Sequence, residues 1–188
     1  MPGQPEEDHL LLKEAQQGDA EAFGALYERH AAAIFRYLYV HLSSRPDAED
    51  LTSEVFLRAW QSLPRYHQRG VPFRAYLFRI AHNALVDHYR HSQQAQRLVQ
   101  EEDPASLADW SDPDEALAGK TDRMELSGLL AGLREDYRTV LALRFLSQLS
   151  PVETAMVMQR APGAVRILQH RALEALRKKL QEQKVNKT

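Results

Sequence analysis

The sequence of 188 residues contains no cysteine. A disulfide framework and a thiolate metal site are therefore excluded, and a reducing cytoplasm is the compartment that suits such a chain. The N-terminus, MPGQPEEDHL, lacks the basic start and apolar stretch of a secretory signal. No apolar run approaches the roughly 18 residues needed to cross a membrane. These absences predict a cytoplasmic protein that has no membrane partner.

The signatures of common enzyme classes are also missing. The sequence has no HExxH zinc motif, no phosphate-binding glycine loop and no Ser/His/Asp arrangement. A metal site is an alternative in one basic segment, which carries His82, Asp87, His88 and His91. Histidines on a basic helix more often lie at the surface or contact phosphate. We therefore expect no enzymatic activity, no cofactor and no bound metal.

A large net charge is absent as well, since the formal charge is -2. The charges are nevertheless unevenly distributed. Residues 65–97 carry six arginines against the single acid Asp87, and residues 160–188 carry eight Lys or Arg against Glu174 and Glu182. Each basic segment by itself also suits a solvated helix face. Two such segments within helical patterns favour a polyanionic partner such as nucleic acid.

No part of the sequence alternates apolar and polar residues with a period of two, so an all-α fold is expected. The apolar spacing predicts helices over residues 10–17, 20–42, 47–63, 73–91, 125–133, 136–146, 151–159 and 163–183. Gly18 suits the end of the first helix, and Asp19 suits the cap of the second. Ser150-Pro151-Val152-Glu153 combines a capping box with proline at the first helical position.

Residues 93–122 differ in composition from the helical segments. They include Pro104 and Pro113, and seven carboxylates lie between Glu101 and Glu115. This composition is typical of a linker. We therefore predict two small helical domains, residues 1–92 and 123–188, joined by a flexible acidic linker over residues 93–122.

The second domain has the layout of a helix-turn-helix, with a short helix, a tight turn and a longer basic helix. Arg166, Gln169, His170 and Arg171 are predicted to point away from the apolar face of the longer helix. Arginine can bind guanine in a bidentate manner, and glutamine suits adenine or a phosphate. An ordinary helical hairpin with a charged outer face is the alternative, and a single histidine there is more often a surface residue.

The first basic segment interleaves arginines with aromatic residues and one amide. Its members of interest are Tyr66, Phe73, Arg74, Tyr76, Phe78, Arg79, Asn83 and Tyr89. Single-stranded nucleic acid is bound by stacking on aromatic rings and by charge along its backbone. A base taken out of a duplex also needs hydrogen bonds to its edge. Tyr66 and Asn83 are candidates for these two roles, whereas Phe73 and Phe78 also suit a hydrophobic core.

Four segments resemble those of one family. Residues 47–60, DAEDLTSEVFLRAW, closely resemble the polymerase-binding segment of extracytoplasmic-function (ECF) sigma factors, which belong to the sigma-70 family. Residues 73–83, FRAYLFRIAHN, resemble the promoter-melting segment of that family. Residues 149–155 and 163–173 resemble its helix-turn-helix, which reads the -35 element. Because these motifs follow the family's order, they are a far more specific signal than one helix-turn-helix.

The resemblance implies a transcription initiation factor that binds core RNA polymerase and promoter DNA and opens the strands. Its implied polymerase contacts, with the clamp helices of the largest subunit, are Asp47, Asp50, Glu54, Phe56 and Trp60. The implied -10 residues are Tyr66, Arg74, Tyr76, Arg79, Asn83 and Asp87. The implied -35 residues are Arg160, Arg166, Gln169, His170 and Arg171. A second contact is implied with the polymerase flap.

Some points stay open at this stage. Phe56 or Trp60 also fits the core of its own domain. Ile167 stands where a small polar residue is common in the family, so the preferred promoter sequence is open. A stand-alone DNA-binding regulator is the alternative function, but it leaves the polymerase-binding and melting motifs unexplained. An anti-sigma factor would bind the surface that binds polymerase, and the sequence does not decide whether one exists.

Overall fold

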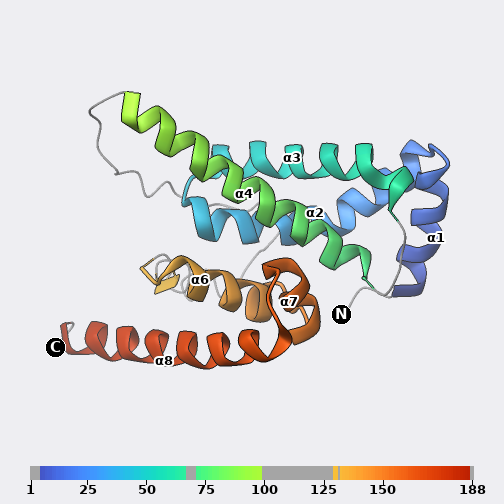
Figure 1. The fold of residues 1–188 in the computed structure, drawn as a ribbon. Helices are drawn as coiled ribbons and strands as arrows, with labels where there is room; N and C mark the ends of the chain where they lie inside the picture. The colour runs from blue at the N-terminus through green and yellow to red at the C-terminus, as the bar shows by residue number, and fades with distance from the viewer. Residues whose placement is uncertain (1–4, 67–70, 99–128, 131, 187–188) are drawn as a thin grey trace, which may run out of the picture.

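The computed structural model describes residues 5–66, 71–98, 129–130 and 132–186, and within that part it is helical and contains no strand (Figure 1). The N-terminal unit consists of α1 (Pro5–Gln16), α2 (Ala20–Leu42), α3 (Arg45–Ser62), the 3-10 turn η1 (Leu63–Arg65) and α4 (Phe73–Leu98). The C-terminal unit consists of α6 (Glu135–Leu141), the π-helical turn η2 (Ala142–Leu146), α7 (Pro151–Met158) and α8 (Pro162–Asn186). The predicted all-α fold is confirmed.

The helix ends follow the local sequence signals. Gly18 has a φ of 96°, which is the left-handed conformation that glycine adopts without a steric penalty. The Asp19 carboxylate then accepts hydrogen bonds from the backbone N–H groups of Glu21 and Ala22, at 2.9 and 3.1 Å. At the start of α7, the Ser150 N–H donates to the Glu153 carboxylate at 2.7 Å. The Glu153 N–H donates to the Ser150 hydroxyl at 3.2 Å, so the predicted capping box is present.

Several helix boundaries differ from expectation, and α1 begins at Pro5, five residues before its predicted start. α3 begins at Arg45 because Ser44 caps it, so the break after α2 is shorter than predicted. α4 continues to Leu98 and enters the segment that composition assigned to the linker. Residues 93–98 contain no proline or glycine that would end the helix, and the first proline beyond them is Pro104. The rest of the predicted linker lies outside the described residues.

The core of the N-terminal unit lies between α2, α3 and α4. Leu26, Ile34 and Leu38 of α2 are fully buried. The rings of Tyr37 and Phe78 meet edge to face, with centroids 5.6 Å apart. Further buried side chains complete this core: Val55, Leu63, Leu77 and Leu85. This packing fixes the outer faces of α3 and α4, on which most of the predicted contact residues lie.

α1 is attached to the bundle by its buried Leu12 and Ala15 and by polar contacts at both ends. The Asp8 carboxylate pairs with Arg29 at 2.6 Å and with His30 at 3.0 Å. At the other end of α1, the Gln16 amide donates to the backbone carbonyls of Leu63 and Tyr66, at 3.1 and 2.6 Å. α1 therefore secures the turn that connects α3 to the loop before α4.

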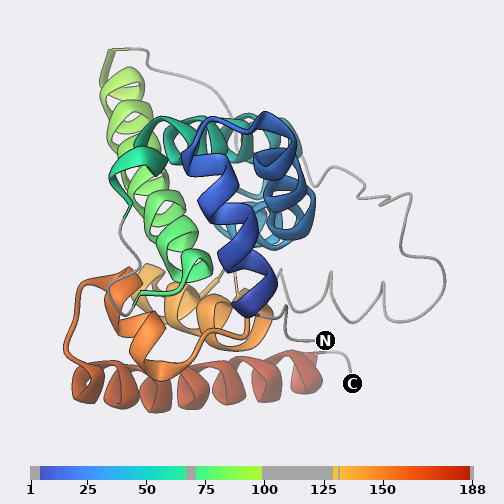
Figure 2. The same cartoon turned by 90° about the vertical axis from the view of Figure 1, so that its right-hand side faces the viewer.

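The two units pack directly against each other, with α4 on α7 and α2 on η2 (Figure 2). Nε2 of the buried His41 is 3.1 Å from the Thr139 hydroxyl, across the interface. The Arg138 guanidinium donates to the His41 carbonyl at 3.4 Å. Arg74 of α4 donates to the Ser147 carbonyl of the C-terminal unit. The interface therefore contains buried polar groups with specific partners.

Candidate nucleic-acid and protein interfaces

α3 presents a row of acidic side chains. Asp47 and Asp50 are exposed, and Glu54 is half-exposed and pairs with Arg58 at 2.6 Å. Phe56 differs from the expectation for a surface contact, because only 3% of it is exposed. The helix turns Phe56 toward α2, where its ring meets that of Tyr27 with centroids 4.7 Å apart. Phe56 is therefore a core residue that supports this surface from below.

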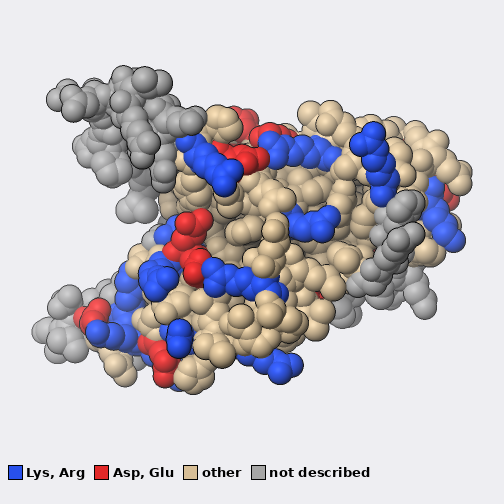
Figure 3. All heavy atoms as spheres, viewed as in Figure 1, with Lys and Arg blue, Asp and Glu red and all other residues tan. Residues whose placement is uncertain are grey.

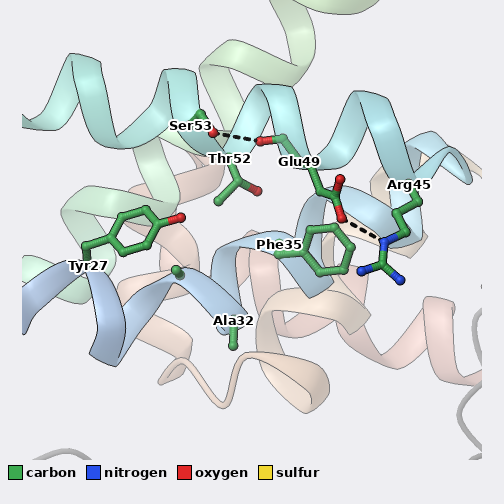
Figure 4. Close-up of a pocket in the computed structure, with 8 residues that line it drawn as sticks. Tyr27, Ala32, Phe35, Arg45, Glu49, Thr52 and Ser53 are labelled. Atoms are coloured by element: carbon green, nitrogen blue, oxygen red, sulfur yellow. Dashed lines mark hydrogen bonds and ion pairs between the residues drawn. The ribbon is translucent and has the colours of Figure 1, made fainter. Parts of the chain in front are cut away.

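The face shared by α2 and α3 contains two shallow hollows. The first (Figure 4) is lined by Tyr27, Ala31, Ala32 and Phe35 of α2 and by Arg45, Glu49, Thr52 and Ser53 of α3. The second is lined by Ala20, Phe23, Phe56, Leu57 and Trp60. The Phe23 and Trp60 rings meet with centroids 4.8 Å apart, and Trp60 is partly exposed. We call this surface the α2–α3 face; aromatic and aliphatic residues contribute much of its lining, and Glu49 is the acidic residue that lines it.

Tyr66 and Tyr76 form a packed aromatic cluster with Phe73. The rings of Tyr66 and Tyr76 have centroids 4.7 Å apart, and only 7% and 8% of these residues is exposed. The Tyr66 hydroxyl donates to the Val71 carbonyl at 2.7 Å, and the Tyr76 hydroxyl is 2.5 Å from that of Ser62. Burial raises the pKa of Tyr66 to about 12. Neither ring offers an open stacking surface in this conformation, contrary to the expectation from sequence.

The remaining -10 candidates on α4 lie on two different sides of the helix. Arg79 and Asn83 are exposed, and the Arg79 guanidinium lies 5.6 Å from the centroid of the Tyr76 ring. Asp87, further along this side, accepts a hydrogen bond from Arg58 at 3.3 Å. Arg74 instead points to the C-terminal unit, since it precedes Tyr76 by two residues and so projects from nearly the opposite side. The structure therefore groups Arg79, Asn83 and Asp87 and separates Arg74 from them.

The proposed metal ligands of α4 have separate partners. Nδ1 of His82 lies 3.0 Å from the Tyr37 hydroxyl, inside the bundle. Nδ1 of His91 lies 2.8 Å from the backbone carbonyl of Asp87, while the Asp87 carboxylate faces Arg58. Within the described residues, no three His, Asp or Glu side chains gather in a way that would hold a metal ion. The metal alternative therefore gains no support from geometry.

α7 and α8 form the predicted helix-turn-helix. The turn contains Gln159 in the left-handed conformation, with a φ of 52°. Arg160 of the turn pairs with Asp136 of α6 at 3.0 Å, so one of the predicted -35 residues also ties the turn to its own unit. Val165 and Ala172 of α8 are completely buried. This packing directs the opposite face of α8 to solvent.

Four predicted -35 residues lie on α8, and they differ in exposure and in hydrogen-bond partners. Arg166, His170 and Arg171 are exposed, and Nδ1 of His170 is 3.6 Å from the Glu174 carboxylate. The Gln169 amide oxygen accepts a hydrogen bond from Arg144 at 3.1 Å. Because bidentate binding of adenine needs both the oxygen and the nitrogen of the amide, Gln169 is not free for it in this conformation. Basic side chains predominate along the edge of the molecule formed by α8 (Figure 3).

Comparison with known proteins identifies these units. A family model described as Sigma-70 region 2 matches residues 26–95, and one described as Sigma-70, region 4 matches residues 123–176. The ECF RNA polymerase sigma factor SigL of Mycobacterium tuberculosis is 33% identical over 168 residues, which cover 89% of this chain and 94% of SigL. The chain belongs to the ECF group of the sigma-70 family.

Other relatives of this sigma factor agree. The ECF RNA polymerase sigma factor BldN of Streptomyces coelicolor is 34% identical over 170 residues, which are 88% of this chain but only 63% of BldN. The structure of CnrH in complex with the cytosolic domain of CnrY has a TM-score of 0.72 and 27% identity, and covers 94% of this chain and 98% of CnrH. The sigma factor RpoE of Bartonella quintana, solved with the anti-sigma factor NepR, shares the fold, with a TM-score of 0.74 and 21% identity over 86% of this chain and 98% of RpoE.

Sigma factors are transcription initiation factors that act with RNA polymerase at promoters and are not enzymes, so the predicted function class is confirmed. No helix in the described part of this sigma factor is long and apolar enough to span a membrane.

Sequence reasoning missed Leu57 and Tyr27, which are 56% and 42% exposed on the α2–α3 face. The spacing of Asp50, Glu54 and Leu57 by four and then three residues could have placed Leu57 on the acidic face.

Proposed function

We propose that residues 1–92 bind core RNA polymerase and open the -10 element, that residues 93–122 link the units, and that residues 123–188 read the -35 element. The observation that carries this proposal is the presence of three outward faces on one chain: the α2–α3 face, the Arg79–Asn83 side of α4 and the exposed side of α8. The protein would act in the cytoplasm, where its polymerase and promoters are.

The α2–α3 face suits a helical partner that carries basic residues. Its apolar floor, with Phe23, Leu57 and Trp60, provides the burial that stabilises a helix in a groove. Asp47, Asp50 and Glu54 of α3, which do not line the hollows, would attract positive charge and set the orientation of the partner. This combination supports docking on the clamp helices of the largest polymerase subunit. The C-terminal unit would contact the polymerase flap.

The exposed side of α4 would act on the opened -10 strand. Arg79 is placed to hold a phosphate, and the Asn83 amide can satisfy a base edge that unpairing exposes. Tyr66 and Tyr76 form the packed support beneath Arg79. Use of the Tyr66 ring for stacking would require it to leave its packing against Phe73 and Tyr76. Arg74 would join this site only after the contact with Ser147 is released.

The exposed side of α8 would enter the major groove of the -35 element. Arg166, His170 and Arg171 lie in the first half of this helix, which is the part that reaches base edges in helix-turn-helix proteins. Arg160 in the preceding turn would contact the DNA backbone, in exchange for its pairing with Asp136. Gln169 would orient the helix through Arg144 and would use only its amide N–H group toward DNA.

Two surface variants test the separation of these roles. Leu57→Asp on the α2–α3 face should abolish binding to core polymerase and leave binding to a -35 duplex unchanged. Arg166→Ala on α8 should weaken binding to the -35 duplex and leave binding to core polymerase unchanged. Fluorescence anisotropy with labelled sigma factor and purified core enzyme measures the first interaction, and labelled duplex measures the second. A wild-type protein that binds duplex but not core polymerase would identify a stand-alone regulator and overturn the proposal.

An anti-sigma factor is the second partner that we propose for the α2–α3 face. The solved complex of CnrH with the cytosolic domain of CnrY supports a protein regulator for proteins of this kind. A regulator that covers Leu57 and Trp60 would exclude polymerase by direct competition. Competition between a co-purified protein and core enzyme for labelled sigma factor, with loss of both interactions in Leu57→Asp, would support this partner.

A further inference from the structure

Ile167 of α8 is an exposed aliphatic side chain on a charged surface. It is 58% exposed, which is more than any other large hydrophobic residue described on α8 and slightly more than Leu57 of α3. Together with Arg166, His170, Arg171 and Glu174 it lines a shallow hollow on the outer side of α8. The other lining residues are polar or charged. Because most of this side chain is exposed, Ile167 is not part of the hydrophobic core.

The position of Ile167 on the helix is fixed by the buried residues. Val165 and Ala172 are completely buried and define the core side of α8. At 3.6 residues per turn, Ile167 lies about 200° from Val165, directly opposite the core. His170 and Arg171, three and four residues later, flank it on the same face. Ile167 therefore lies at the centre of the surface that the two arginines and the histidine surround.

The chemistry of the major groove offers one matching group. Its base edges present hydrogen-bond donors and acceptors, and the C5 methyl group of thymine is the apolar feature among them. Ile167 is the sixth residue of α8, within the part of a recognition helix that approaches bases. We infer that Ile167 packs against the C5 methyl of a thymine in the -35 element and selects that base. This inference rests on the proposed function of α8 as the recognition helix.

The flanking charges favour DNA over a protein as the partner of this side chain. Arg166 and Arg171 are both positive and exposed, which suits two phosphates or guanines on either side of one base pair. Glu174 beside His170 discourages phosphate at the far end of the hollow and limits the helix to one register. Ile167 then supplies base selectivity between the positions held by the arginines.

Removal of a single methyl group tests the contact. The full-length protein first selects its preferred duplexes from a randomised pool. Each thymine of the selected -35 element is then replaced by deoxyuridine, which lacks only the C5 methyl. At one position, this replacement should weaken wild-type binding by about fourfold, the effect of burying one methyl group. Ile167→Ala should weaken binding to the thymine duplex by a similar factor and bind thymine and deoxyuridine duplexes equally.

Arg166→Ala is the matched control. It should weaken binding to both duplexes and retain the preference for thymine. If both Arg166→Ala and Arg171→Ala leave DNA binding unchanged, the assignment of the recognition helix fails. If they weaken binding but no thymine position responds to deoxyuridine, or Ile167→Ala keeps the preference, only the inference on Ile167 is overturned. Loss of core-polymerase binding by Ile167→Ala with an intact thymine preference would also overturn it. Thermal unfolding confirms that each variant is folded.

Discussion

The Arg74 guanidinium of α4 donates a hydrogen bond to the backbone carbonyl of Ser147, and so joins the two units of the protein. Arg74 is half-buried there, and burial lowers its pKa below the ordinary value for arginine. The Ser147 hydroxyl is buried, with no hydrogen-bond partner in the described part of the chain. A residue of the segment that resembles the family's promoter-melting segment is thus engaged in a contact between the two units.

The first prediction concerns this contact. Arg74→Ala combined with Thr139→Val should loosen the packing of the two units, because each removes a hydrogen bond across the interface. The chain has no cysteine, so spin labels attach only to introduced Asp50→Cys and Lys178→Cys, both at exposed positions. Electron–electron double resonance should give one narrow distance for the parent and a broader distribution for the double variant.

Arg79→Ala is the control for this experiment, since Arg79 is exposed on another side of α4. It should leave the distance distribution unchanged. A double variant with the narrow distribution of the parent would show that Arg74 and Thr139 do not hold the units together.

The second prediction is a dependence of stability on pH. Burial lowers the pKa of His41 to about 4, from an ordinary value of 6.5. The packed protein therefore holds the neutral imidazole, and its stabilisation is complete above pH 6.5 and decreases as the pH falls toward 4. At pH 5 the loss should be about 2 kcal/mol, from 1.36 kcal/mol per pKa unit. Urea unfolding at pH 7.5 and pH 5 measures it.

At pH 5 the change in stability from His41 is separated from protonation of the buried Asp8. Burial opposes ionisation of Asp8, but His30 and Arg29 outweigh it and hold the pKa below the ordinary value of 3.8. Asp8 therefore stays ionised at pH 5. Burial also lowers the pKa of His82, so some pH dependence should remain in His41→Gln. A His41→Gln slope equal to that of the wild type would contradict the assignment.

The third prediction distinguishes Tyr66, which supports the fold, from Asn83, which we propose to contact DNA. Tyr66→Ala should lower the free energy of unfolding by about 3 kcal/mol or more, because it removes a buried ring. Asn83→Ala, at an exposed position, should change it by less than about 0.5 kcal/mol. Permanganate footprinting with polymerase holoenzyme should show fewer unpaired thymines for Asn83→Ala on duplex promoter, with transcription restored on a pre-opened bubble. Normal opening by Asn83→Ala would exclude this amide from melting.

The fourth prediction concerns the turn between α7 and α8. Gln159 has a φ of 52°, a conformation that costs an L-residue roughly 1–2 kcal/mol relative to glycine. Gln159→Gly should therefore raise the free energy of unfolding, by about 0.5–1 kcal/mol after the entropic cost of glycine. Gln159→Ala should not. Urea unfolding of both variants checks this, and a glycine variant less stable than the alanine variant would contradict it.

Much of the fold follows from the sequence alone. The spacing of apolar residues predicted α2, and local side-chain chemistry placed Asp19 and the Ser150–Glu153 capping box correctly. These features depend on residues within one or two helical turns of one another, so the local sequence contains the information. The end of α4 was harder to predict, because residues 93–98 are compatible with both a helix and a linker.

The sequence by itself determined that this protein is an all-α sigma factor with two helical units, since helix signals and motif order are local properties of the chain. Only the tertiary structure decided which candidate residues reach the surface. The aromatic rings of Phe56 and Tyr66 suit either a hydrophobic core or a contact with a binding partner. In the structure both are buried, Phe56 packed against Tyr27 and Tyr66 packed against Tyr76. The orientation of Arg74 toward Ser147 joins positions 73 residues apart. Helical periodicity fixes the faces of one helix, but it does not specify which face will meet a distant neighbour.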